Sequence, residues 1–230
     1  MISMVNSMIR KLFIALNNLK ILSLFYLGVF LLIAFVMWTL GVYFIDVRAI
    51  GPQGSSVGFA TINGYIHRLT GTHMLLYTIT DWMGILPVCV ALGFAALGLI
   101  QWIKRKNILK VDCSILTLGA FYIVVMAVYF LFEEVIINYR PVLINGYLEV
   151  SYPSSTTLLV MCVMPTAILQ LKSRIRNGAL RKLTVILIII FTTFMVMGRL
   201  VSGVHWFSDI IGASLFSAGL VTVYHSLTDL

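Results

Sequence analysis

The chain has 230 residues, of which 60% are hydrophobic and 10% are charged. Soluble domains carry roughly one charged residue in four, so this composition excludes a water-soluble globule and predicts a polytopic membrane protein. The formal net charge of +8 would suggest nucleic-acid binding in a soluble protein. Here the basic residues gather beside apolar segments, so we expect the lipid bilayer as partner and no nucleic acid. The sequence leaves the oligomeric state open.

Six apolar segments approach or reach the roughly 20 residues that cross a hydrocarbon core. They predict an all-α fold, with six transmembrane helices in a bundle and one membrane domain over residues 1–230. The expected spans cover residues 21–45, 82–103, 113–137, 153–171, 183–199 and 209–228. The first is too long for a signal-peptide core, so we expect it to be retained. Residues 1–19 form either a cytoplasmic amphipathic helix on the bilayer or a frayed tail.

Basic residues alternate between the loops and predict the orientation of the chain. Clusters lie in residues 10–20, 104–110 and 172–182, whereas the remaining arginines lie in the intervening loops. The positive-inside rule then places both termini in the cytoplasm. We expect a multi-pass protein of the plasma membrane with the intervening loops facing outward.

The longest loop and the cysteines have simple interpretations. Residues 46–81 form the longest loop, with a turn at residues 51–54 followed by apolar residues at helical spacing, which favours a helix on the outer surface. Cys89, Cys113 and Cys162 fall inside apolar segments without a CxxC pattern. They are expected to be small buried hydrophobic residues, and neither a disulfide nor a zinc site is predicted.

Polar residues gather at the outer ends of the last four spans. Arg140 follows the third span, residues 152–157 open the fourth, and Arg199, His205 and Asp209 lie between the fifth and the sixth. Ionisable residues beside membrane spans are costly and often functional. We therefore expect these three segments to converge on one outward-facing site.

The residue types in this cluster suit a phosphate group. Two guanidinium groups offer planar forks of donors, and the start of a helix offers hydroxyl and backbone N–H groups. The helix start supplies Ser154, Ser155 and Thr156. His205 lies four residues before Asp209, a spacing at which a carboxylate can orient an imidazole if the segment is helical.

Each residue also has a purely structural interpretation. Ser154 and Thr156 are ordinary helix-capping types, and Asp209 is suited to cap the last span. Arginines at span ends can also reach lipid phosphates as simple anchors. The occurrence of all these residues on one face favours the phosphate site.

The motifs resemble those of the type-2 phosphatidic acid phosphatases, a lipid phosphatase family related to the vanadium haloperoxidases. The family signature is K-x6-R-P, then P-S-G-H, then S-R-x5-H-x3-D. Residues 198–209 keep the Arg, His and Asp of the third motif at the family spacing. Arg140 and Pro141 are kept from the first motif, and Pro153 and Ser154 from the second.

The resemblance implies roles for the residues that match. His205 would be the nucleophile that forms a phosphohistidine, and Asp209 its orienting partner. Arg140, Arg199 and Ser154 would bind the phosphate, and no metal or other cofactor would be needed. The implied substrate is a lipid phosphate or diphosphate whose tail stays in the bilayer.

The chain departs from the family in both of the first two motifs. Glu133 replaces the lysine, while Ser155 and Thr156 replace the glycine and the histidine. Proton donation to a leaving alkoxide is worth roughly 10²- to 10⁴-fold, whereas a leaving phosphate with a pKa of about 6 needs little help. We therefore expect a polyprenyl diphosphate to be favoured over phosphatidate.

Two other functions remain open. One is a catalytically impaired phosphate-lipid-binding or transport protein, and the other is a lipid phosphotransferase. Glu133 would repel phosphate unless it is turned away, protonated or paired with an arginine.

Overall fold

The computed structural model describes the backbone of residues 2–228 and the side chains of residues 16–228. The fold is all-α, as predicted, and its ordered elements follow in chain order. They are α1 (Ile2–Phe44), η1 (Pro52–Gly54), α2 (Ala60–Thr70), α3 (Met74–Met83), α4 (Ile85–Arg105), η2 (Ile108–Lys110), α5 (Cys113–Glu134), α6 (Ser155–Arg174), α7 (Gly178–Val201) and α8 (Phe207–Thr228).

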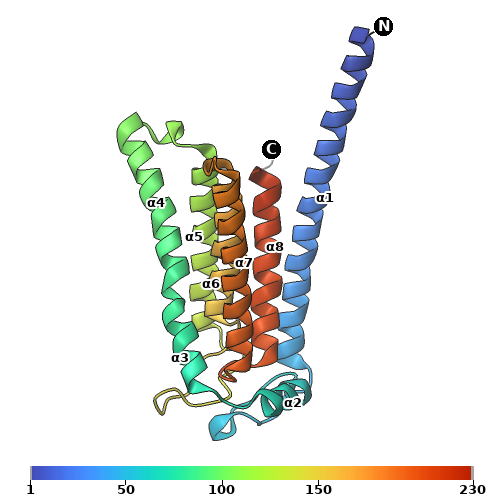
Figure 1. The fold of residues 1–230 in the computed structure, drawn as a ribbon. Helices are drawn as coiled ribbons and strands as arrows, with labels where there is room; N and C mark the ends of the chain where they lie inside the picture. Colours follow the sequence, from blue (N-terminus) through green and yellow to red (C-terminus); the bar gives the residue numbers. More distant parts are fainter. Residues whose placement is uncertain (1, 229–230) are drawn as a thin grey trace.

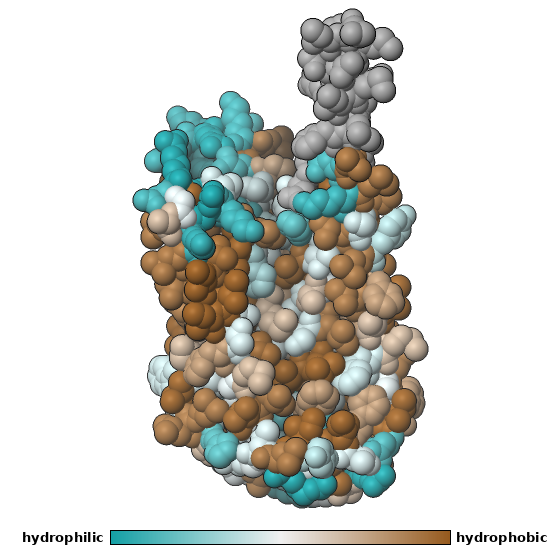
Figure 2. All heavy atoms as spheres, turned by 45° about the vertical axis from the view of Figure 1, so that its right-hand side comes forward, coloured by the Kyte–Doolittle hydropathy of each residue, from teal (hydrophilic) through white to brown (hydrophobic). Residues whose placement is uncertain are grey.

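Six segments of the described chain are long and apolar enough to cross a membrane, which confirms the predicted number of spans. In Figure 1 the long helices run side by side, with both termini at one end and α2 at the other. Figure 2 shows hydrophobic surface over the middle of the bundle and hydrophilic surface at its ends. This distribution suits a protein whose middle is surrounded by lipid.

The second span begins earlier than expected. It extends over Met74–Arg105 rather than 82–103, as α3 followed by α4 with a break at Gly84. The expected boundary was placed at Asp81, the charged residue of α3. In the structure the carboxylate of Asp81 pairs with a guanidinium, so this charge does not end the helix.

The other boundaries differ by a few residues. The remaining spans are Leu16–Phe44, Cys113–Glu134, Ser155–Arg174, Gly178–Val201 and Phe207–Thr228. The backbone of residues 2–20 continues into α1 without a break, so this segment is not a separate helix. The side chains of residues 1–15, on which the predicted amphipathic surface depends, lie outside the described residues.

Small residues allow α1 and α8 to approach closely. A Cβ atom on Gly219 would lie 2.9 Å from Cγ of Leu32. A Cβ atom on Gly28 would lie 2.7 Å from Cγ2 of Val223. Close contact between helix backbones is how helices in lipid gain packing energy.

Only part of the prediction for the cysteines is correct. Cys162 on α6 is buried, whereas Cys89 on α4 and Cys113 on α5 are exposed. Much of the surface of α4 and α5 faces outward, so these two thiols lie on the outside of the bundle.

Candidate active site

A structured loop between α5 and α6 carries Arg140 to the site. The loop folds back on itself through the antiparallel bridge between Tyr139 and Val150. The backbone N–H of Arg140 donates to the carbonyl of Glu149 across this bridge at 2.9 Å. The loop ends in a cis peptide bond before Pro153, after which α6 begins.

His205 lies in the turn between α7 and α8. Gly203 in this turn has a φ of +67°, and a Cβ atom there would lie 1.8 Å from the carbonyl oxygen of Gly71. Only glycine fits this left-handed conformation at such a close approach. The turn buries His205, whose side chain is 2% exposed.

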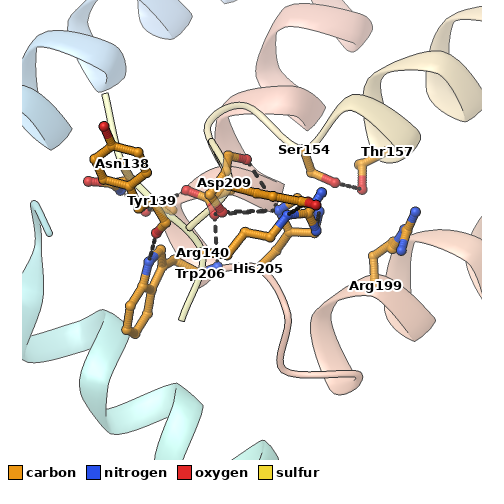
Figure 3. A network of polar contacts seen from close by, with 12 residues as sticks. Asn138, Tyr139, Arg140, Ser154, Thr157, Arg199, His205, Trp206 and Asp209 are labelled. Atoms are coloured by element: carbon orange, nitrogen blue, oxygen red, sulfur yellow. Dashed lines mark hydrogen bonds and ion pairs between the residues drawn. The ribbon is translucent and has the colours of Figure 1, made fainter. Parts of the chain in front are cut away.

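The hydrogen bonds of His205 fix its tautomer. Its Nε2 atom lies 3.2 Å from Nη1 of Arg140, and the two side chains meet in Figure 3. A guanidinium only donates, so Nε2 must be the acceptor and must carry the lone pair. The proton is then on Nδ1, which lies 3.2 Å from the carbonyl oxygen of Ser151.

Ser151 is part of the connection between His205 and Asp209, which the sequence did not predict. Nδ1 of His205 lies 3.6 Å from Oδ2 of Asp209, beyond ordinary hydrogen-bond length. The hydroxyl of Ser151 donates to Oδ2 of Asp209, and its Oγ lies 3.2 Å from Nδ1. The orienting partner of the imidazole is therefore Ser151 together with Asp209.

The environment of His205 keeps its imidazole neutral. Burial, together with the nearby charges of Arg140 and Arg199, lowers the pKa of His205 to about 4. The hydrogen bond and charge of Asp209 act in the opposite direction but do not prevail. At neutral pH the Nε2 lone pair is therefore available for attack on an electrophile.

A buried amide network supports the start of α8 beside Asp209. Ser208 donates its backbone N–H to Oδ1 of Asn63 at 3.0 Å and accepts from Nδ2 of Asn63 at 2.9 Å. Asn138 donates weakly to the same hydroxyl at 3.4 Å. Helix α2, which carries Asn63, thus anchors the start of α8 beside His205 and Asp209.

Arg199 is the second guanidinium of the site and is almost fully buried, with 1% of its surface exposed. Its Nη2 atom donates to Oδ1 of Asp81 at 2.7 Å and to the hydroxyl of Thr156. The Tyr77 ring on α3 lies 4.9 Å from Cζ of Arg199 and 5.8 Å from Cζ of Arg140. Helix α3 therefore contacts both cations through Asp81 and Tyr77, a role that was not predicted for either residue.

Gly198 explains how α3 reaches this position. A Cβ atom on Gly198 would lie 2.7 Å from Cγ2 of Thr80. The family has serine at this place in its third motif, and a serine would push α3 away from α7. With no side chain at Gly198, α3 packs close to α7, and Asp81 on α3 pairs with Arg199 on α7.

Several donor atoms of the two guanidinium groups have no hydrogen-bond partner among the described residues. For Arg199 these are Nε and Nη1, both buried. Nε of Arg140 is within 3.0 Å of Oε2 of Glu149 but lacks hydrogen-bonding geometry. Buried unpartnered donors are rare and costly, and an anion placed between the two arginines would satisfy them.

A cavity of about 520 Å³ opens at Arg140 and His205, whereas Arg199 is not among its lining residues. Arg140, Ser155 and His205 line it, and apolar residues of α5 and α6 such as Phe132 and Leu158 complete the wall. Its acidic lining residues are Asp81, Glu133 and Glu149. Glu133 is exposed at the end of α5 and forms no ion pair with any described residue.

The structure thus brings most of the predicted residues together. Ser154 and Thr156 differ from the prediction, because neither of them lines the cavity. Ser154 is fully buried, and its hydroxyl donates to Oγ1 of Thr157 at 3.0 Å rather than facing the cavity. Thr156 contacts Arg199. Within residues 16–228, no three His, Cys, Asp or Glu side chains are arranged to hold a metal ion.

Comparison with known proteins agrees with this geometry. Residues 134–229 match the PAP2 superfamily, a segment that contains Arg140, Arg199, His205 and Asp209. The chain also has the fold of a transmembrane PAP2-type phosphatidylglycerolphosphate phosphatase from Bacillus subtilis, with a TM-score of 0.54 and 18% identity over 87% of this chain and 94% of that one. No curated protein matches the sequence. The superfamily match over residues 134–229 and the shared fold support a membrane protein of the PAP2 family, in agreement with the resemblance of the motifs.

Proposed function

We propose that this protein is a lipid phosphatase in which His205 attacks the phosphorus of a lipid phosphate or diphosphate. The observation that carries the proposal is the position of Nε2 of His205, with its lone pair beside Arg140 on a cavity of about 520 Å³. The superfamily match and the name of the Bacillus subtilis phosphatase support the same activity.

The reaction would proceed in two displacements. Nε2 attacks phosphorus, the bond to the leaving oxygen breaks, and a phosphohistidine forms. Water then attacks the phosphohistidine, which releases phosphate and returns the lone pair to Nε2. Arg140 and Arg199 would stabilise the charge on the non-bridging oxygens, while Ser151 and Asp209 would hold the proton on Nδ1.

The surroundings of Thr156 favour a diphosphate substrate. Thr156 occupies the place of the family histidine, and its hydroxyl accepts from Arg199. A threonine hydroxyl is a poor proton donor to a leaving alkoxide, whereas a phosphate leaving group needs little protonation. We therefore favour a polyprenyl diphosphate, bound from the outer leaflet with its tail among the lipids.

The basic loops support this orientation. The site lies at the end of the bundle opposite the two termini, and the clusters at residues 104–110 and 172–182 lie at the end that holds the termini. The positive-inside rule places the basic end in the cytoplasm, so the site would face outward.

The test is phosphate release by purified protein in detergent from a polyprenyl diphosphate and from phosphatidate, each compared with His205→Ala. We expect release from the diphosphate at least about tenfold faster, and no release by the variant. Equal rates on both substrates would contradict the leaving-group argument. Full activity of His205→Ala would contradict the nucleophile.

A phosphotransferase is the second candidate, because the carboxylate of Glu133 lines the cavity without an arginine partner among the described residues, whereas Asp81 and Glu149 pair with Arg199 and Arg140. An unpaired carboxylate would suit an acceptor with a cationic group. Consumption of the diphosphate without free phosphate would favour the transferase. Binding without consumption of substrate would favour a phosphate-lipid-binding protein.

A further inference from the structure

A second cavity lies at the opposite end of the bundle from the candidate active site. It has a volume of about 470 Å³ and is formed between the end of α6 and the start of α7. Its lining residues are Lys172, Gly178, Arg181, Lys182, Val185 and Ile186. The proposed phosphatase chemistry does not use any of them.

All the charged residues that line this cavity are basic. Lys172, Arg181 and Lys182 are all exposed, and their side chains have no hydrogen bond or ion pair with any described residue. No acidic residue lines the cavity. The first residue of α7, Gly178, also lines it, and the start of a helix adds positive potential. These features together favour an anion.

Apolar residues continue the cavity toward the middle of the membrane. Val185 is partly buried and Ile186 is 44% exposed, and both lie about two turns along α7 from Gly178. A ligand that contacts both the cations and these residues needs an anionic head and a hydrocarbon tail. Inorganic phosphate or a nucleotide would use only the polar half.

We propose that this basic cavity binds one anionic phospholipid of the leaflet on the side of the chain termini. The phosphate group would lie among Lys172, Arg181 and Lys182, and an acyl chain would lie along Val185 and Ile186. Basic pockets between transmembrane helices on the cytoplasmic side are suited to such headgroups. The lipid would connect α6 and α7, whose far ends carry Thr156 and Arg199.

The alternative is that these cations only follow the general excess of positive charge in this leaflet, and the chain offers a matched control for it. Lys104, Lys106 and Lys110 lie at the same end of the bundle, near the connection between α4 and α5, and are also exposed. None of them lines a described cavity. A K104Q/K106Q/K110Q variant therefore removes the same charge without touching the proposed site.

The experiment is native mass spectrometry of the purified protein in detergent, titrated with phosphatidylglycerol or with phosphatidylcholine of the same acyl chains. We expect one phosphatidylglycerol to bind wild type with preference, and K172Q/R181Q/K182Q to lower its affinity at least about tenfold. K104Q/K106Q/K110Q should change it less than about twofold. The charge-conserving variant K172R/R181K/K182R should keep its affinity for phosphatidylglycerol. This result can be interpreted even if K172Q/R181Q/K182Q does not fold.

Three outcomes would overturn the proposal. Equal losses in the two glutamine variants would show a general effect of charge. Equal binding of phosphatidylcholine would show that the headgroup is not recognised. Competition by glycerol 1-phosphate as strong as that by phosphatidylglycerol would show a site for soluble phosphates rather than for a lipid.

Discussion

Nη1 of Arg140 lies 3.2 Å from Nε2 of His205, so the cation that would bind phosphate also faces the atom that would attack it. This contact points the lone pair of Nε2 at the guanidinium of Arg140, whose charge opposes protonation of the ring. A phosphate that enters would accept from Arg140 and leave Nε2 free for attack on phosphorus.

The first prediction concerns the pH dependence of the proposed reaction. The pKa of His205 is lowered to about 4, so the ring stays neutral and kcat/KM of wild type should fall only below about pH 5. Arg140 disfavours the protonated ring, so Arg140→Gln should raise the pKa and move this fall toward higher pH.

The measurement is kcat/KM against pH for the two proteins on one substrate, because substrate ionisation then affects both profiles alike. Arg48→Gln changes an arginine of the outer loop and should leave the profile unchanged. Coincident wild-type and Arg140→Gln profiles would mean that Arg140 does not act on the ring.

The second prediction concerns Asp81, which holds Nη2 of Arg199. Asp81→Ala should lower kcat/KM about tenfold, chiefly through kcat, because the buried guanidinium loses its carboxylate. Asp81→Glu should recover part of the loss. Asp112→Ala removes a carboxylate from an exposed ion pair with Arg105 at the other end of the bundle and should have little effect. Similar losses in both alanine variants would indicate general destabilisation instead.

The third prediction concerns the approach of α3 to α7. Gly198→Ser restores the family residue but brings Cβ to 2.7 Å from Cγ2 of Thr80, which should cost about 1–3 kcal/mol. Thr80→Ser removes that methyl group, so the double variant should regain stability in a thermal unfolding measurement. Gly93→Ser, where a Cβ would meet nothing within 4 Å, serves as control. Equal unfolding temperatures for the three single variants would contradict the close contact.

The fourth prediction concerns the missing proton donor. Thr156→His should raise the rate on phosphatidate relative to polyprenyl diphosphate by about tenfold, because an imidazolium can protonate the alkoxide. Ser155→His places the same group one residue earlier on the cavity wall and should not change the ratio. If the ratio of the rates on phosphatidate and polyprenyl diphosphate is unchanged in Thr156→His, the residue at this position does not determine which substrate is preferred.

The spans and the motif residues were predictable because each is encoded locally. A charge-free apolar segment specifies a helix in lipid, and the spacing of Arg199, His205 and Asp209 is visible in one short segment. Arg140 was recognisable from the proline that follows it. The meeting of these residues in the structure then depends on packing at the outer ends of the helices.

Other parts of the site depend on long-range contacts that no local pattern reveals. Asp81 looked like a loop residue because its partner, Arg199, lies far along the chain. Ser151 stands before the recognised Pro153 and Ser154, and its role appears only once His205 folds against it. The apolar stretch from Met74 to Trp82, with one charge, was the signal that could have extended the second span.

The most direct test of the account is the capture of a phosphoenzyme. Wild type and His205→Ala are incubated with a polyprenyl diphosphate labelled on the terminal phosphorus and quenched in alkali, which preserves phosphohistidine, and the label is mapped by mass spectrometry. The account predicts label on His205 in wild type and none in the variant. Turnover by wild type with no label on His205, or label on another residue in both proteins, would contradict it.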